Sequence, residues 1–136
     1  MYAGGNASRG INIRSREYFA RPYSKIEEDN RRKEENGRFP KGCHTLKAKV
    51  WHEFGHLMDS VVGISSDIRI QNAISRSKDL GIDLSGYAYE SLQAGMCREV
   101  FAEAVSEAKC SPSPRKMAVD IWNMAEKVIQ EWRKKK

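Results

Sequence analysis

Two segments of the chain repeat apolar residues at the three- and four-residue steps that place side chains on one face of an α-helix. The first follows Thr45, a residue type suited to an N-cap, and stops at Gly63, a residue type that often ends a helix. The second runs from Pro114 to about Trp132. The first stripe consists of Leu46, Val50, Phe54, Leu57 and Val61. The second consists of Ala118, Ile121, Trp122, Ala125, Val128, Ile129 and Trp132. We expect both stripes to face the core.

The stretch between these two segments predicts more helix. Ser65 or Ser66 suits the cap of a polar helix across Asp67–Leu80. Residues 82–95 hold several glycines and tyrosines and are typical of irregular structure or a short turn of helix. Residues 96–109 are helical again, and prolines follow them.

One strand is predicted near the start of the chain, across Gly10–Phe19. Ile11 and Ile13 alternate there with polar residues, which is the period of a half-buried strand. Residues 24–42 are polar and end in turn formers, so we expect a loop with at most a short exposed helical turn. The pattern therefore predicts a mostly helical chain with one strand near its start, which is an α+β composition.

Composition narrows the class of protein without pointing to a function. With 136 residues, 40% of them hydrophobic, the chain can form one domain and bury a core without disulfides. Cys43, Cys97 and Cys110 lack a C-x-x-C spacing, which disfavours both a thiolate zinc site and a disulfide framework. No apolar run approaches membrane-spanning length and no signal-peptide core is evident, so we expect no membrane partner.

The formal net charge is +6, and the tail Arg133–Lys136 is wholly basic. Such a tail could contact nucleic acid. We prefer a solvated helix end, whose cations suit the negative end of the helix dipole. No interleaving of aromatic and basic residues elsewhere supports nucleic-acid binding, so that function is disfavoured.

The strongest chemical signal is an H-E-x-x-H pattern formed by His52, Glu53 and His56. On a helix, positions i and i+4 share a face, so both imidazoles can reach one metal ion. Two neutral imidazoles suit Zn²⁺, which takes a third protein ligand and keeps an open position for water. Glu53 is offset around the helix and can act as a general base beside the metal.

The third ligand must come from elsewhere in the chain. A histidine six residues after His56 would complete one common solution, but Val62 stands there. The other common solution takes a carboxylate from a separate helix, and Glu99 and Glu103 lie four residues apart on one helical face. Like charges at that spacing repel each other, and a nearby dication would relieve the repulsion.

The two motifs HEFGHLMD and EVFAEAV, with the lead-in GCHTLKAKV, resemble the catalytic domain of anthrax lethal factor and its relatives. Similar domains occur in other bacterial toxins and in phage-encoded head-associated proteins. They are zincins of the gluzincin type, zinc endopeptidases or domains derived from them. The resemblance covers about Gly42–Lys109. It implies a single zincin-like metallopeptidase domain over residues 1–136, which could be excised from a longer protein. It also implies an α+β, mostly helical fold with a small sheet packed on the H-E-x-x-H helix.

Carried over residue by residue, the resemblance makes His52, His56 and Glu99 the zinc ligands and Glu53 the general base. It makes Glu103 a carboxylate that orients a ligand.

The resemblance also implies supporting roles outside the ligand set. Asp59 matches an acidic position after the first motif and could accept a hydrogen bond from a liganding imidazole. A tyrosine before the glutamate motif should help to hold the developing oxyanion. Both Tyr87 and Tyr89 are candidates, and we prefer Tyr87 because it follows Gly86 in a turn-like stretch.

These observations predict a zinc metalloendopeptidase that acts on a polypeptide substrate, with the strand at Gly10–Phe19 available to pair with an extended peptide. The alternative is a phage- or toxin-associated structural or binding module that keeps a zinc site with little or no hydrolase activity. A larger parent polypeptide or a phage assembly fits either prediction. We expect a cytoplasmic or phage-associated location.

Overall fold

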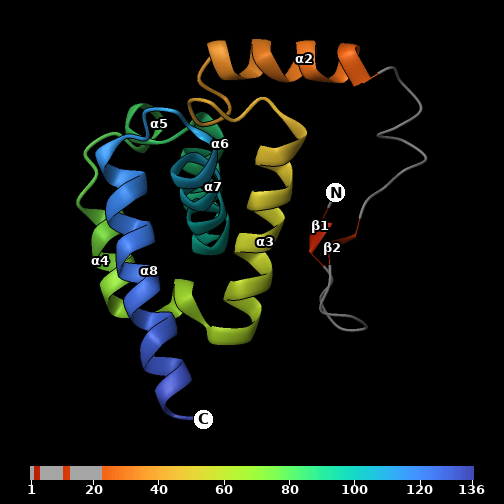
Figure 1. Ribbon diagram of the computed structural model, residues 1–136. Helices are drawn as coiled ribbons and strands as arrows, with labels where there is room; N and C mark the ends of the chain where they lie inside the picture. Colours follow the sequence, from red (N-terminus) through yellow and green to blue (C-terminus); the bar gives the residue numbers. More distant parts are fainter. Residues whose placement is uncertain (1, 4–10, 13–22) are drawn as a thin grey trace.

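The computed structural model describes residues 2–3, 11–12 and 23–136, and helices dominate them (Figure 1). The elements in chain order are β1 (Tyr2–Ala3), β2 (Ile11–Asn12), α2 (Tyr23–Glu35), α3 (Leu46–Val62), the 3₁₀ helix η1 (Ile64–Ser66), α4 (Ile68–Ser75), α5 (Leu80–Asp83), α6 (Gly86–Gln93), α7 (Cys97–Cys110) and α8 (Lys116–Lys134).

Helix α7 lies at the centre of the fold. Helices α3, α6 and α8 pack around it, and α4 packs on α8 (Figure 1). Every residue from Val100 to Glu107 is buried, so α7 has no solvated face along most of its length. A helix that is buried on all sides forms the interior of a domain. The chain thus folds around the segment that carries Glu99 and Glu103.

Helices α3 and α7 approach each other closely where both carry small side chains. A β-carbon on Gly55 would lie only 3.2 Å from Ala102 Cα and 3.4 Å from Val105 Cβ. One turn away along α7, the Ser106 hydroxyl donates to the Ala48 carbonyl oxygen at 3.0 Å. Backbones can approach in this way only where no larger side chain intervenes.

The face of α3 that packs on the core differs from the predicted one. Val50 and Phe54 are each 38% exposed, and Val61 is exposed as well, whereas Glu53 and Gly55 are buried. The prediction that the large apolar stripe faces the core is therefore wrong for these three residues. The small residues Ala48 and Gly55 on the side of α3 that faces α7 permit the close contact between the two helices.

The predictions for α8 and for both ends of α3 are confirmed. Thr45 accepts a hydrogen bond from the Ala48 backbone N–H at 3.2 Å, and Gly63 ends the helix with a φ of 80°. That left-handed conformation is one that glycine adopts at little cost. On α8, four members of the predicted stripe are buried: Ala118, Ile121, Ala125 and Val128.

The predicted α+β class is wrong, because the fold is all-helical. The one piece of β-structure in the described residues is an antiparallel pair in which Tyr2 opposes Asn12 and Ala3 opposes Ile11. Two residues per strand form no layer. The core instead closes by helix packing, with α7 between α3 and α8. Apart from Ile11–Asn12, the strand predicted across Gly10–Phe19 lies outside the described residues.

Three predicted boundaries also need correction. The loop predicted over residues 24–42 contains the 13-residue helix α2, which buries Ile26 and Asn30 one turn apart. The helix predicted across Asp67–Leu80 ends at Ser75, and its cap is Asp67. Residues 82–95 are largely helical, because Ser85 caps α6.

None of the helices in the described part of the chain combines the length and the hydropathy needed to cross a bilayer.

The contact at Gly55 predicts a specific stability effect. Gly55→Leu should lower the free energy of unfolding by about 1–3 kcal/mol, the usual cost of overpacking a tight contact. Lys47→Leu, on an exposed position of the same helix, should change it by less than about 0.5 kcal/mol. Urea denaturation followed by circular dichroism measures both. Equal stability of Gly55→Leu and wild type would contradict the close approach.

Candidate metal centre

Helices α3 and α7 bring two histidines and one glutamate to a single point. His52 Nε2 lies 3.2 Å from Glu99 Oε2, and His56 Nε2 lies 3.0 Å from the same oxygen. The three potential ligand atoms all lie within 4.8 Å of one another. The histidines share one face of α3 because they are four residues apart. The structure thus brings together the three predicted ligands.

Glu103, one turn after Glu99, binds the opposite side of the His52 ring. Its Oε2 lies 3.1 Å from His52 Nδ1, and its Oε1 accepts a hydrogen bond from the Ser85 hydroxyl at 2.9 Å. Ser85 in turn accepts from the Ala88 backbone N–H as the cap of α6. A carboxylate that holds Nδ1–H fixes the tautomer in which Nε2 is free to bind a metal. This is the orienting position predicted for Glu103.

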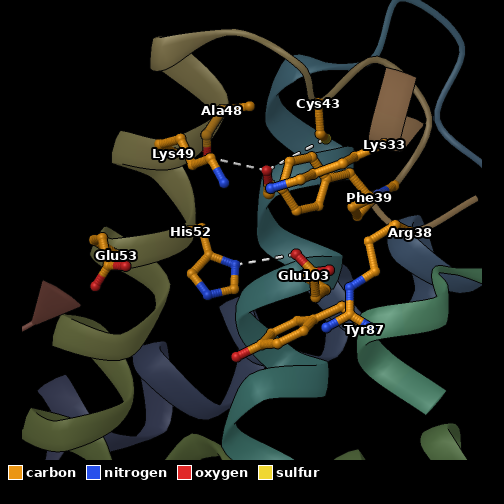
Figure 2. A pocket seen from close by; sticks show the side chains of 12 residues that line it. Lys33, Arg38, Phe39, Cys43, Ala48, Lys49, His52, Glu53, Tyr87 and Glu103 are labelled. Atoms are coloured by element: carbon orange, nitrogen blue, oxygen red, sulfur yellow. Dashed lines mark hydrogen bonds and ion pairs between the residues drawn. The ribbon is translucent and has the colours of Figure 1, made fainter. Parts of the chain in front are cut away.

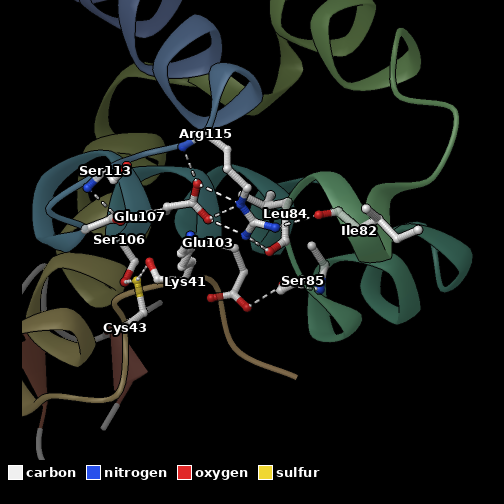
Figure 3. A network of polar contacts seen from close by, with 12 residues as sticks. Lys41, Cys43, Ile82, Leu84, Ser85, Glu103, Ser106, Glu107, Ser113 and Arg115 are labelled. Atoms are coloured by element: carbon white, nitrogen blue, oxygen red, sulfur yellow. Dashed lines mark hydrogen bonds and ion pairs between the residues drawn. The ribbon is translucent and has the colours of Figure 1, made fainter. Parts of the chain in front are cut away.

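A second buried carboxylate, that of Glu107, lies one turn after Glu103 near the C-terminal end of α7 and helps to position Ser85 (Figure 3). Glu107 is 0% exposed and accepts from both the backbone N–H and the guanidinium of Arg115, the residue that precedes α8. The same guanidinium donates to the carbonyl oxygens of Ile82 and Leu84. Because Leu84 directly precedes Ser85, this network holds the residue that binds Glu103.

The charges of the site are strongly coupled. Burial alone would lower the pKa of His52, but hydrogen bonds to Glu103 and Glu99 outweigh it and raise the pKa to about 9. Burial would raise the pKa of Glu99, but hydrogen bonds from His52 and His56 hold it well below its usual range. Both nitrogens of His52 face carboxylate oxygens, so without a metal the doubly protonated ring donates to both.

Glu53 is buried beside this cluster, and its Oε2 has no hydrogen-bond partner in the part of the chain that the structure describes. Burial raises the pKa of Glu53, and the nearby charges of His52 and His56 oppose that rise. A buried acceptor without a donor is costly, and native proteins seldom leave one unless a water, an ion or a ligand completes it.

A cavity of about 410 Å³ opens onto the site (Figure 2). His52, Glu53 and Glu103 form part of its wall, and Tyr87 forms another part. The Tyr87 and His52 ring centroids are 6.3 Å apart. Burial, and next the charge of Glu99, raise the pKa of Tyr87, so its phenol keeps its proton at neutral pH.

Two of the predicted supporting residues lie away from the site. Both oxygens of Asp59 bind Ser65, at 2.6 Å to the backbone nitrogen and 2.7 Å to the hydroxyl, so Asp59 holds η1 against the end of α3 rather than an imidazole. The predicted role of Asp59 is therefore corrected. Tyr89 is 48% exposed, two positions after Tyr87 on the short helix α6, and it does not line the cavity beside His52.

The donor set suits zinc. Two imidazoles and one carboxylate, with a further carboxylate on the second nitrogen of one imidazole, match a three-ligand site that leaves one position open. Glu53 Oε2, which has no partner among residues 2–3, 11–12 and 23–136, fits a group that receives a proton at that position. Other divalent metals also bind nitrogen and oxygen donors, so zinc itself is a proposal.

The chain matches no protein-family model, no curated protein and no solved structure.

Several residues of the site were not predicted. Ser85 is visible in hindsight as a serine two residues before Tyr87 at the start of a helix, the position of an N-cap. Arg115 and Glu107 carry no comparable signal. Their pairing depends on how α5 and α8 meet at the end of α7, which is a tertiary contact.

Metal binding should displace a proton, because His52 is protonated in the apoprotein at neutral pH. We expect Zn²⁺ to release about one proton at pH 7, measured by calorimetry in buffers of different ionisation enthalpy. The stabilising His52 ion pairs are fully present below pH 6.5 and are lost as the pH rises through about 9. Zinc affinity should therefore rise over that range. Heats that do not depend on the buffer would contradict a protonated His52.

The two glutamates should differ in their effect on zinc affinity. Glu103→Gln should weaken binding by about 10–100-fold, the usual cost of losing an outer carboxylate, and Glu99→Gln should weaken it more. Glu126→Gln on the exposed surface of α8 is the matched control and should bind as wild type does. Zinc affinity of Glu99→Gln equal to wild type would show that the third ligand is misassigned.

Proposed function

We propose that this protein is a zinc-dependent endopeptidase of the gluzincin type. The observation that carries the proposal is the buried Glu53 carboxylate near the His52, His56 and Glu99 cluster. One oxygen of this carboxylate has no hydrogen-bond partner among the described residues. A structural metal site needs no such group, whereas hydrolysis needs a base next to the attacking water.

The proposed chemistry divides between the metal and the protein. A bound zinc ion would polarise the scissile carbonyl and lower the pKa of its water towards about 7. Glu53 accepts the proton of the attacking water and later delivers it to the leaving amine. Burial raises the pKa of Glu53 towards the working pH, which suits a group that must both take and return a proton.

Tyr87 is the proposed donor to the oxyanion. Its phenol keeps its proton, and its ring lies in the cavity wall across from His52. A neutral donor fixed beside the reacting carbonyl stabilises the charge that develops there. A polypeptide substrate would enter through the same cavity.

Glu53→Gln should abolish turnover while leaving zinc bound. The amide cannot take a proton, and losing general base catalysis costs about 10²–10⁴-fold in rate. The measurement is hydrolysis of an unstructured protein such as casein by zinc-loaded protein, with zinc content determined on the same samples. Full proteolysis by zinc-loaded Glu53→Gln would refute the role of Glu53.

Tyr87→Phe should lower kcat by about 100-fold with little change in KM, because the lost hydrogen bond forms only in the transition state. Tyr89→Phe, the exposed neighbour on the same helix, is the matched control and should behave as wild type. Steady-state kinetics on one cleaved peptide compares the three proteins. An unchanged kcat for Tyr87→Phe would remove Tyr87 from the mechanism.

A second candidate is a phage- or toxin-associated structural or binding module that uses zinc for folding or docking. Two observations favour it. The four polar side chains His52, His56, Glu99 and Glu103 already bind one another. The described residues also hold no strand longer than two residues, so they supply no long edge for an extended substrate. Zinc that raises Tm without any peptide hydrolysis would favour this candidate.

A further inference from the structure

The cavity beside the metal centre has a cationic wall. Lys33 comes from the last turn of α2, Arg38 from the loop that follows, and Lys49 from α3, one turn before His52. Figure 2 shows the three side chains on the cavity wall beyond His52 and Glu103. Three segments of the chain thus direct positive charge into the space that reaches the site.

The two lysines lie at one aromatic ring, and no carboxylate of the described residues forms a direct ion pair with either of them. Lys49 Nζ lies 3.9 Å and Lys33 Nζ 5.5 Å from the centroid of the same Phe39 ring, and their ammonium groups point towards each other (Figure 2). Burial lowers the pKa of Lys49, the charge of Glu103 opposes that effect, and the charge of Lys33 lowers the pKa further. An anion between them would relieve both costs.

Arg38 links this wall to the proposed oxyanion residue. Its guanidinium lies over the Tyr87 ring, 5.2 Å from the centroid, and donates to Glu90. The carbonyl oxygens of Gly37 and Arg38 accept from the backbone N–H groups of Gly86 and Tyr87, at 2.7 and 3.2 Å. The loop is therefore fixed to the start of α6, and the cationic wall keeps a defined position relative to the site.

Two acidic residues line the same cavity, Glu53 and Glu103, and neither forms a direct ion pair with Lys33 or Lys49. The oxygens of Glu103 bind His52 and Ser85 instead, so Glu103 acts on Lys49 only through its charge. The cavity thus has a metal-binding end and a cationic end, and at the cationic end Arg38 pairs with Glu90 while Lys33 and Lys49 have no direct ion pair among the described residues.

We infer that the cationic end of the cavity binds the side-chain carboxylate of an acidic residue in the substrate, held by Lys33, Lys49 and Arg38 while the scissile bond lies at the metal centre. This inference rests on the proposed function for the identity of the ligand as a polypeptide. An unpaired lysine pair at one end of a cleft selects substrates by charge, since a neutral side chain would leave both ammonium groups without a partner.

The test uses zinc-loaded Glu53→Gln protein, so that binding is measured without cleavage. The probes are short fluorescent peptides with an amidated C-terminus that differ only in carrying Glu or Gln, with the variable residue moved along the peptide. Fluorescence anisotropy gives Kd for each pair. For at least one position, the Glu peptide should bind about tenfold more tightly than the Gln peptide.

That ratio should fall towards one when Lys49→Met or Lys33→Met is added, and it should persist with Lys47→Met, an exposed lysine of α3 outside the cavity. Circular dichroism and zinc affinity of each variant exclude misfolding as the cause. Lys33 lies on an exposed position of α2, so its variant remains informative if Lys49→Met folds poorly. Equal affinity for Glu and Gln peptides at every position would overturn the inference.

A further pair of peptides distinguishes a side-chain carboxylate from a C-terminal carboxylate as the group that the wall binds. A Gln peptide with a free C-terminal carboxylate should bind no better than its amidated form. Tighter binding that depends on Lys49 would show that the wall holds a chain terminus, and would overturn the side-chain assignment.

Failure of the inference and failure of the proposed function give different results. Wild-type protein that cleaves peptides without preference for acidic residues would refute only the inference. Protein that prefers Glu peptides through Lys33 and Lys49 but cleaves none would refute only the proposed function.

Discussion

The close approach of α3 and α7 at Gly55 is the contact on which the rest of the structure depends. With only 3.2 Å available between a β-carbon on Gly55 and Ala102 Cα, the two backbones lie nearly in contact. His52 and His56 then flank this contact on one helix, and Glu99 and Glu103 flank it on the other. At that separation their side chains meet directly, whereas a wider spacing would leave room for water between them.

This packing also explains why a central helix can carry two buried glutamates. A buried carboxylate is stable only when it is paired and hydrogen-bonded. Glu103 meets that condition through His52 and Ser85, and Glu107 meets it through Arg115. The hydrogen bonds of Glu103 and those of Glu107 meet between α5 and α6. There the Leu84 carbonyl oxygen accepts from Arg115, and the hydroxyl of the adjacent Ser85 donates to Glu103. Glu103 and Glu107, one turn apart on α7, are therefore held by the same segment of chain, Leu84 and Ser85.

The sequence predicted the parts of this account that depend on local chemistry. Helical spacing placed His52 and His56 on one face, and the caps Thr45 and Gly63 set the ends of α3 because capping is a local effect. It did not predict which face of α3 is buried. Hydrophobicity favoured Val50 and Phe54, but the close packing of two helices depends on small residues, which a hydrophobic pattern does not weigh.

The prediction of an α+β fold was wrong for a related reason, because it too rested on a local hydrophobic pattern. The alternation at Ile11 and Ile13 suggested a sheet, yet the described core is complete without one, because α7 is covered by helices on all sides. The cationic wall was also beyond sequence reasoning. Lys33 and Lys49 are 16 positions apart in the chain, and only the folding of α2 over the start of α3 brings them to one aromatic ring.

The central claim is that this helix contact gathers His52, His56 and Glu99 around one metal ion. X-ray absorption spectroscopy of the zinc-loaded protein tests it most directly, because it reports the atoms bound to zinc. The account predicts two imidazole nitrogens at about 2.0–2.1 Å and oxygen ligands at about 2.0–2.2 Å, with no sulfur. A zinc–sulfur distance of about 2.3 Å, or a spectrum with fewer than two imidazoles, would contradict it.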